Sequence, residues 1–147
     1  MDAQHRLILV HNTFTQAADV SFANKWGEVY WASCPNANLY IENRLPDYNM
    51  LREEGAIICL GTDSLCSNWQ LSIVEEIKTI FKYNSYLPLM DILQWGTING
   101  ARALGISDEY GTIEEGKVPG LVNLNMNWEL PESILRMQDY GRIDLFL

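Results

Sequence analysis

The sequence predicts an α/β fold in which short parallel strands alternate with helices. Three compact apolar segments, each followed by a stretch of helical composition, support this prediction: residues 6–10, 28–32 and 56–60. Strand–helix units in series place successive strands parallel to one another, with right-handed crossovers. The apolar segments are nearly continuous, which is typical of parallel strands that are buried on both faces.

Helices are expected between and after these strands, at residues 15–25, 47–54, 70–83 and 89–104. Gly55 and Gly105 follow two of them and are typical helix-ending residues. Beyond Gly105 the pattern changes and predicts, in order, a short strand with a turn at 111–117, a half-exposed strand at 121–126, a short helix at 131–139 and a last strand at 143–147.

Composition places the chain among globular domains. Its 147 residues are 48% hydrophobic and 11% aromatic, which is enough to bury a core without disulfides. Acidic residues outnumber basic ones by 19 to 10, and this net charge of -9 repels phosphate groups. Neither nucleic acid nor a membrane is therefore expected as a partner. Three cysteines without a CxxC pair favour reduced thiols and a cytoplasmic location.

Polar residues gather directly after each predicted strand, at residues 11–13, 33–38 and 62–68. Parallel α/β folds carry their chemistry at the carboxyl-terminal edge of the sheet. The sequence therefore directs attention to that edge.

His11 and Asp63 are the main candidates for chemistry there. His11 could act as a general acid or base or bind a metal, although a strand-end histidine bonded to a backbone carbonyl is the commoner case. Asp63 could bind a metal and accept a proton from metal-bound water, or it could cap a turn or helix. Ser67 and Asn68 could cap the next helix or hydrogen-bond a substrate. The cysteines match no zinc-binding pattern and are interpreted as packing residues.

Four segments follow one another in an informative order. They are Leu-Val-His-Asn at 9–12, Cys-Pro-Asn-Ala-Asn-Leu at 34–39, Leu-Gly-Thr-Asp-Ser-Leu-Cys-Ser-Asn at 60–68 and residues 97–122. Together they resemble the carboxyl-terminal part of amidohydrolase-superfamily enzymes, in the branch of cyclic deaminases and chlorohydrolase-like proteins. The first three resemble the sixth barrel strand and the segments after the seventh and eighth strands. The fourth resembles the final helix and the return into a flanking β-sandwich.

The resemblance implies a fold and a reaction. Residues 1–105 would be the C-terminal portion of a (β/α)8 TIM barrel, about three βα units, and residues 106–147 would return into the small β-sandwich. The implied reaction is hydrolysis of a C–N or C–Cl bond of a small-molecule substrate, as in deaminases. One divalent metal, zinc in the first place and iron as the alternative, would lower the pKa of a bound water toward ~7.

The resemblance also assigns roles to single residues. Asp63 would be a metal ligand and proton acceptor, and His11 would polarise the scissile group or stabilise the oxyanion. Ser67, Asn68 and Asn38 would form the substrate-binding set. Ser33 stands where related deaminases have a histidine, so the substrate class stays open.

The chain supplies three of the eight strands that a barrel of about 250 residues needs. The family's further histidine and glutamate residues would lie upstream, and a catalytic zinc takes three protein ligands. We therefore expect a fragment that holds no metal and is inactive alone. Its unpaired strand edges favour a homo-oligomer, or association with the missing N-terminal part of the barrel.

Two other interpretations stay open. The chain could be a small α/β domain that binds a ligand or partner without catalysis, although such a domain needs neither His11 nor Asp63 at its strand ends. A flavodoxin-like regulator is less favoured, because it would need an acidic cluster where residues 11–13 are His-Asn-Thr.

Overall fold

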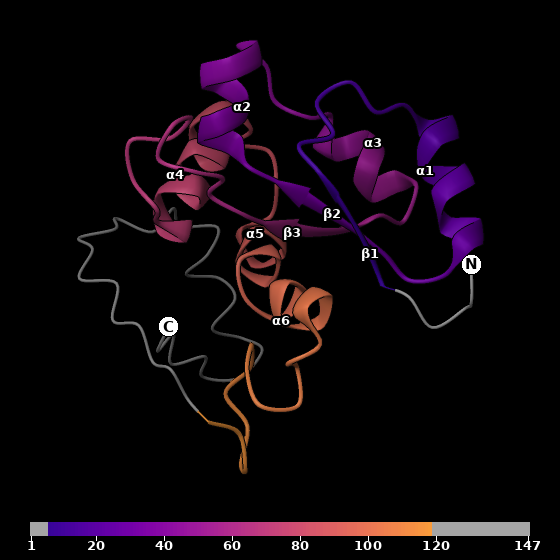
Figure 1. Ribbon diagram of the computed structural model, residues 1–147, viewed down its shortest axis with the longest axis vertical. Helices are drawn as coiled ribbons and strands as arrows, with labels where there is room; N and C mark the ends of the chain where they lie inside the picture. The colour runs from indigo at the N-terminus through magenta and orange to yellow at the C-terminus, as the bar shows by residue number, and fades with distance from the viewer. Residues whose placement is uncertain (1–5, 119–147) are drawn as a thin grey trace. The chain divides into compact units, whose positions relative to one another are not determined.

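The computed structural model describes residues 6–118, and residues 6–117 belong to one compact unit (Figure 1). The strands are β1 (Leu7–Val10), β2 (Val29–Ser33) and β3 (Ile57–Leu60). The helices are α1 (Ala17–Ala23), the short 3-10 helix η1 (Asn24–Trp26), α2 (Pro35–Glu42), α3 (Tyr48–Glu53), α4 (Ile73–Tyr83), α5 (Leu89–Trp95) and α6 (Ile98–Leu104). None of these helices has the length and apolar character that crossing a membrane requires.

The three strands form one parallel sheet in the order β1-β2-β3, which confirms the parallel α/β arrangement. Val10 lies beside Ala32 in the register, and the ladder continues past the strand ends. The His11 N–H donates to the Ala32 carbonyl oxygen at 2.9 Å, and the Gly61 N–H donates to that of Ser33 at 2.9 Å. The carboxyl ends of all three strands therefore meet at one edge, where the polar segments follow.

Helices pack on the sheet through large apolar side chains. β3 contacts α3, α5 and α6, while α2 and α4 lie side by side near the carboxyl ends of β2 and β3 (Figure 1). Tyr48 of α3 and Trp95 of α5 have ring centroids 5.5 Å apart, which joins these two helices. The core side chains of the strands include Trp31 and Ile58, which are almost fully buried.

Strand β1 corrects one prediction. Its apolar sequence predicted burial on both faces, but Leu7, Ile8 and Val10 are 38%, 38% and 53% exposed. Within residues 6–118, β1 pairs with β2 and its other edge has no strand beside it. A continuous apolar strand is buried on both faces only when other elements cover it. The described residues leave that apolar surface of β1 open.

Two helix predictions also need correction. Residues 35–42 form α2, which was not predicted because asparagines are weak helix formers. Pro35 occupies the first turn of this helix, where its missing N–H does no harm. The single helix predicted at 89–104 is divided into α5 and α6 at Gly96. A β-carbon at Gly96 would lie 3.0 Å from Ile73 Cγ2, so close packing favours a glycine there.

The segment after α6 differs from its prediction as well. Residues 111–117 form turns and contain no strand. The predicted strands at 121–126 and 143–147 and the predicted helix at 131–139 lie outside the described residues, and with them most of the expected β-sandwich.

A buried hydrogen bond joins the end of β2 to α3. Ser33 Oγ and the Tyr48 hydroxyl lie 2.7 Å apart, and both side chains are almost completely buried. Burial raises the pKa of Tyr48, so its hydroxyl stays protonated at neutral pH. The Ser33 side chain is therefore committed to packing with α3.

We expect Tyr48→Phe to lower the free energy of unfolding by about 1–3 kcal/mol, because Ser33 Oγ would lose its partner in a buried place. The double variant with Ser33→Ala should lose less than the sum of the two single variants, since it leaves neither hydroxyl unpaired. Urea unfolding measures all three values. If the two single losses of unfolding free energy add up in the double variant, the Ser33–Tyr48 hydrogen bond makes no specific contribution to stability.

Candidate functional site

His11 and Asp63 share an uncommon backbone conformation at the carboxyl edge of the sheet. Their φ angles are 71° and 55°, in the left-handed region, and Asn12 follows with 59°. For residues other than glycine this conformation costs of the order of 1–3 kcal/mol and persists where the surroundings impose it. The Asn12 side chain donates to the Leu9 carbonyl oxygen at 2.8 Å and so stabilises the first turn. Asn43 is the fourth described residue other than glycine with a positive φ angle. Such strain is concentrated at functional sites in proteins, which is consistent with the selection of His11 and Asp63 as candidates.

Asn38, on α2, orients the imidazole of His11. Its Oδ1 lies 2.9 Å from His11 Nδ1, and its Nδ2 donates to the His11 carbonyl oxygen at 3.1 Å. Because the His11 carbonyl oxygen can only accept a hydrogen bond, the end of the Asn38 amide that faces it must be the NH2 group. The amide oxygen therefore faces the imidazole ring, and Nδ1 must hold the proton. The neutral imidazole then has its lone pair on Nε2, which remains available for a proton or a metal. Sequence reasoning placed Asn38 against a substrate, whereas the structure places it against His11.

Ser67 holds the carboxylate of Asp63. Its Oγ donates to Asp63 Oδ2 at 2.6 Å, a short bond to a charged acceptor. Burial raises the pKa of the Cys34 thiol to about 11, and the nearby charges of Asp63 and Glu76 add to this rise. The loops after β2 and β3 are tightly packed here, as shown by the 3.2 Å that would separate a β-carbon at Gly61 from Cys34 Sγ.

A buried carboxylate connects the loops that follow β2 and β3. Glu76, on α4, is 0% exposed. Its Oε2 accepts the Asn36 backbone N–H at 2.8 Å, and its Oε1 accepts the side-chain amides of Asn36 at 2.9 Å and of Asn68 at 2.6 Å. Burial raises the pKa of Glu76, and the hydrogen bonds to its oxygens oppose that rise.

The asparagines of this network have further partners. The Asn68 side chain also donates to the Thr62 carbonyl oxygen at 2.9 Å, and Thr79 Oγ1 donates to Asn36 Oδ1 at 2.6 Å. Asn68, predicted as a substrate contact, is therefore held between Thr62 and Glu76 and is almost fully buried. The structure gives it a part in fixing the loop.

Sequence reasoning missed Glu76 although a signal was present. Along α4, Ile73, Ile77 and Ile80 recur at helical spacing, and Glu76 falls on the same side of the helix. A carboxylate at an apolar-face position indicates a buried polar network. Its partner Asn36 lies 40 positions away, and neither this contact nor the one to Asn68, 8 positions away, was evident from the spacing.

Hydrogen bonds thus join the predicted site residues in two pairs, His11 with Asn38 and Asp63 with Ser67. Within residues 6–118, no three His, Cys, Asp or Glu side chains lie close enough together to hold a metal ion. One imidazole and one carboxylate are fewer than the three ligands of a catalytic zinc. A zinc site therefore does not fit the described residues alone.

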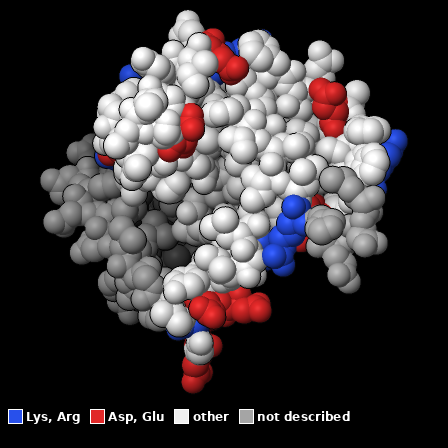
Figure 2. Space-filling model, in the orientation of Figure 1, with Lys and Arg blue, Asp and Glu red and all other residues white. Residues whose placement is uncertain are grey.

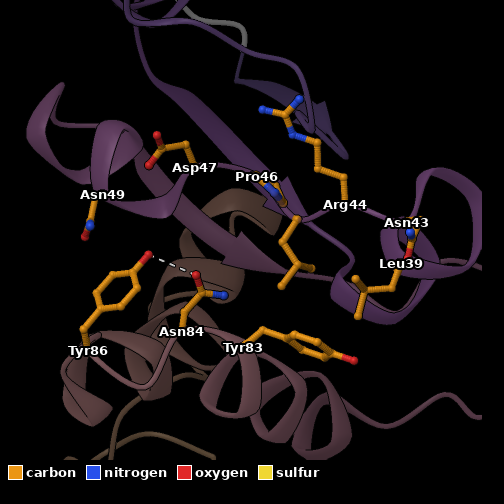
Figure 3. Close-up of a pocket in the computed structure, with 10 residues that line it drawn as sticks. Leu39, Asn43, Arg44, Pro46, Asp47, Asn49, Tyr83, Asn84 and Tyr86 are labelled. Atoms are coloured by element: carbon orange, nitrogen blue, oxygen red, sulfur yellow. Dashed lines mark hydrogen bonds between the residues drawn. The ribbon is translucent and has the colours of Figure 1, made fainter.

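A pocket of about 580 Å³ lies away from these residues, around the carboxyl-terminal ends of α2 and α4 (Figure 3). Its lining is mostly polar, and Tyr86 points toward Asn84, to which its hydroxyl donates at 3.0 Å. None of the five predicted site residues lines it. Charged side chains are scattered over the face seen in Figure 2 and form no continuous patch there. Neither feature replaces the strand ends as the candidate site.

Comparison with known proteins agrees with the resemblance seen in the motifs. The amidohydrolase family profile matches residues 2–141. A 5-methylthioadenosine/S-adenosylhomocysteine deaminase of Teredinibacter turnerae is 29% identical over 126 residues, which cover 80% of this chain and 28% of that protein. A 5'-deoxyadenosine deaminase of Methanosarcina barkeri is 41% identical over 88 residues, which cover 55% of this chain and 20% of that protein.

Solved structures show the same relation. A crystal structure of an adenosine deaminase from Xanthomonas campestris, with bound zinc, superposes with a TM-score of 0.68 at 30% identity. The match covers 76% of this chain and 27% of that protein. The chain thus spans less than a third of the length of each of these three proteins.

The three thiols should differ sharply in reactivity. Cys66 is exposed, while Cys34 and Cys59 are buried and burial raises the pKa of each to about 11. Because the thiolate is the nucleophile, we expect one fast-reacting thiol of three with Ellman's reagent at about pH 8, and all three after unfolding. Cys66→Ser should remove the fast phase. A fast phase that survives this substitution would contradict the packing role of the other two.

Proposed function

Because the chain belongs to the amidohydrolase family, we propose that it forms the last three βα units of the barrel of a deaminase-type hydrolase. The observation that carries this proposal is the position of His11 and Asp63, both in strained backbone, at the carboxyl ends of the two outer strands of one parallel sheet. Barrel enzymes carry their catalytic residues at that end of the strands. The names of the relatives favour a 5'-substituted adenosine as substrate, with the exocyclic amine as the group removed.

In this proposal Asp63 supplies one ligand of a divalent metal, with zinc favoured over iron. Ser67 fixes the orientation of the carboxylate through its 2.6 Å hydrogen bond. The described residues cannot complete the ligand set, so the other ligands come from polypeptide outside residues 6–118. The proposed metal belongs to the assembled enzyme and not to this chain alone.

His11 has a separate role in the proposal. Its Nδ1 is committed to Asn38, so Nε2 is the atom that faces the reacting group and gives or takes a proton there. A correctly placed acid or base contributes typically about 10²–10⁴-fold to a rate. Asn38 therefore acts on the reaction through His11, by holding the productive tautomer.

The open side of β1 supports a partner for this chain. Leu7, Ile8 and Val10 are more than a third exposed, and the outer edge of the strand has no strand beside it within residues 6–118. We propose that the amino-terminal strands of the barrel cover this edge, and that a second copy of the chain does so when they are absent.

The cytoplasmic location that the cysteines favour remains a prediction.

A non-catalytic binding domain is the second candidate function. The pocket around the ends of α2 and α4, which contains none of the strand-end residues, is the observation in its favour. A domain of this kind would bind its ligand without any contribution from Asp63 or His11, and this difference separates the two functions experimentally.

The chain alone should neither bind zinc stoichiometrically nor deaminate adenosine derivatives, because it presents too few ligands. Metal analysis after dialysis and the change in purine absorbance with 5'-methylthioadenosine or 5'-deoxyadenosine measure both. A stoichiometric, tightly bound ion would contradict the proposed division of ligands.

A chimera tests the proposal in an assembled barrel. The corresponding segment of the Methanosarcina barkeri deaminase is replaced by residues 7–118 of this chain. We expect the chimera to bind zinc and deaminate 5'-deoxyadenosine, and Asp63→Asn to abolish both. Asp108→Asn, at an exposed-loop carboxylate, is the matched control and should change neither. A folded but inactive chimera would favour the binding-domain alternative, and activity that survives Asp63→Asn would overturn the role proposed for Asp63.

Self-association should accompany the open edge of β1. Light scattering is expected to report a mass above that of one chain, and Val10→Lys should shift the mass toward the monomer, because a charge on an edge strand opposes pairing. The control Val118→Lys changes an exposed apolar residue outside the sheet. A monomer at high concentration would exclude the second copy as an occupant of the edge.

A further inference from the structure

We propose that Glu76 is a positioning residue, which locks the loops after β2 and β3 to each other and thereby fixes the orientation of His11 relative to Asp63. The inference rests on the proposed function, in which these two residues act at one site. Glu76 touches neither of them in the network of described hydrogen bonds. It acts through Asn36 on one side and Asn68 on the other.

The connection to His11 runs through the first turn of α2. Glu76 holds Asn36 at both its backbone N–H and its side-chain amide, which fixes the start of the helix. Asn38 lies two residues further in the same turn and makes both hydrogen bonds to His11. A shift of Asn36 would therefore be carried by the helix to Asn38 and to the imidazole.

The connection to Asp63 runs through the loop after β3. The Asn68 side chain is shared between Glu76 and the carbonyl oxygen of Thr62, the residue before Asp63. Ser67, the residue before Asn68, donates to the Asp63 carboxylate. A shift of Asn68 would therefore affect Asp63 in two ways, at its backbone through Thr62 and at its carboxylate through Ser67.

A carboxylate is the side chain that this place requires. Three N–H groups converge on two oxygens, so the central group must accept hydrogen bonds only, which an ionised carboxylate does. A glutamine would turn an NH2 group toward at least one of these donors. An apolar residue would leave the amides of Asn36 and Asn68 unpaired in a buried place. Burying a charge is costly, and fixing the geometry of the two loops is the function that we assign to it.

The test reads the tautomer of His11 directly and needs no catalytic activity. The chain has two histidines, His5 and His11, so His5→Gln assigns the imidazole signals in a ¹H–¹⁵N correlation spectrum. The spectrum is recorded at a pH above which the imidazole signals no longer change, so that only the neutral ring is observed. We expect the chain to show His11 with the proton on Nδ1. Asn38→Ala provides the reference spectrum of an imidazole that has lost its orienting partner.

We expect Glu76→Gln to lose the single Nδ1–H signal and to move the His11 resonances toward those of Asn38→Ala. Glu75→Gln is the matched control, since it makes the same chemical change one residue earlier, at a partly exposed carboxylate that pairs with Lys78 at 2.5 Å. This control should leave the His11 signals in place. A folded Glu76→Gln variant with unchanged His11 signals would overturn the proposal, and so would an equal effect of the control.

A milder variant covers the case in which Glu76→Gln does not fold. Thr79→Val removes only the 2.6 Å hydrogen bond to Asn36 at the margin of the network, and it should shift His11 in the same direction by a smaller amount. Unchanged His11 signals in a folded Thr79→Val variant would then overturn the proposal. The outcome is independent of the chimera assay, so an inactive chimera with a responsive His11 would remove the proposed function and leave the coupling established.

Discussion

Parallel pairing of β2 with both of its neighbours is the constraint on which the rest of the fold depends. Parallel strands all end at the same edge, so the chain must cross back over the sheet before each new strand. The loops that begin these crossovers are forced together at that edge, and their backbone groups need partners there. The buried carboxylate of Glu76 provides some of these partners, because it accepts N–H groups from the loops after β2 and β3. The site is therefore a consequence of the sheet's direction as much as of its own residues.

Much of the fold could be predicted from local pattern. Each strand is a short apolar segment with polar residues after it, and this signal does not depend on distant parts of the chain. Helix α3 was equally accessible, because Asp47 caps its first turn and Gly55 follows its end. Helix α2 was not, since its asparagines are stabilised by tertiary partners and not by helix propensity.

The candidate site was accessible in part. His11 and Asp63 could be selected because they follow strands, and the family motifs supplied the other predicted site residues, Asn38, Ser67 and Asn68. Their partners could not be deduced, since the bond between His11 and Asn38 joins residues 27 positions apart and depends on how α2 is placed. The left-handed backbone of both residues was also invisible in the sequence, because neither is a glycine. The exposure of β1 depends on what lies beside it, which an apolar pattern does not report.

The contact between Gly61 and Cys34 has a consequence for how this site can change. The loop that carries Asp63 passes the start of α2 at a distance that leaves no room for a β-carbon at position 61 without movement of the thiol. A side chain at position 61 would require the Cys34 thiol, at the N-cap of α2, to move by a few tenths of an ångström. Variation at the two strand ends is therefore not independent. A redesign of either loop must therefore accommodate the other side of this contact.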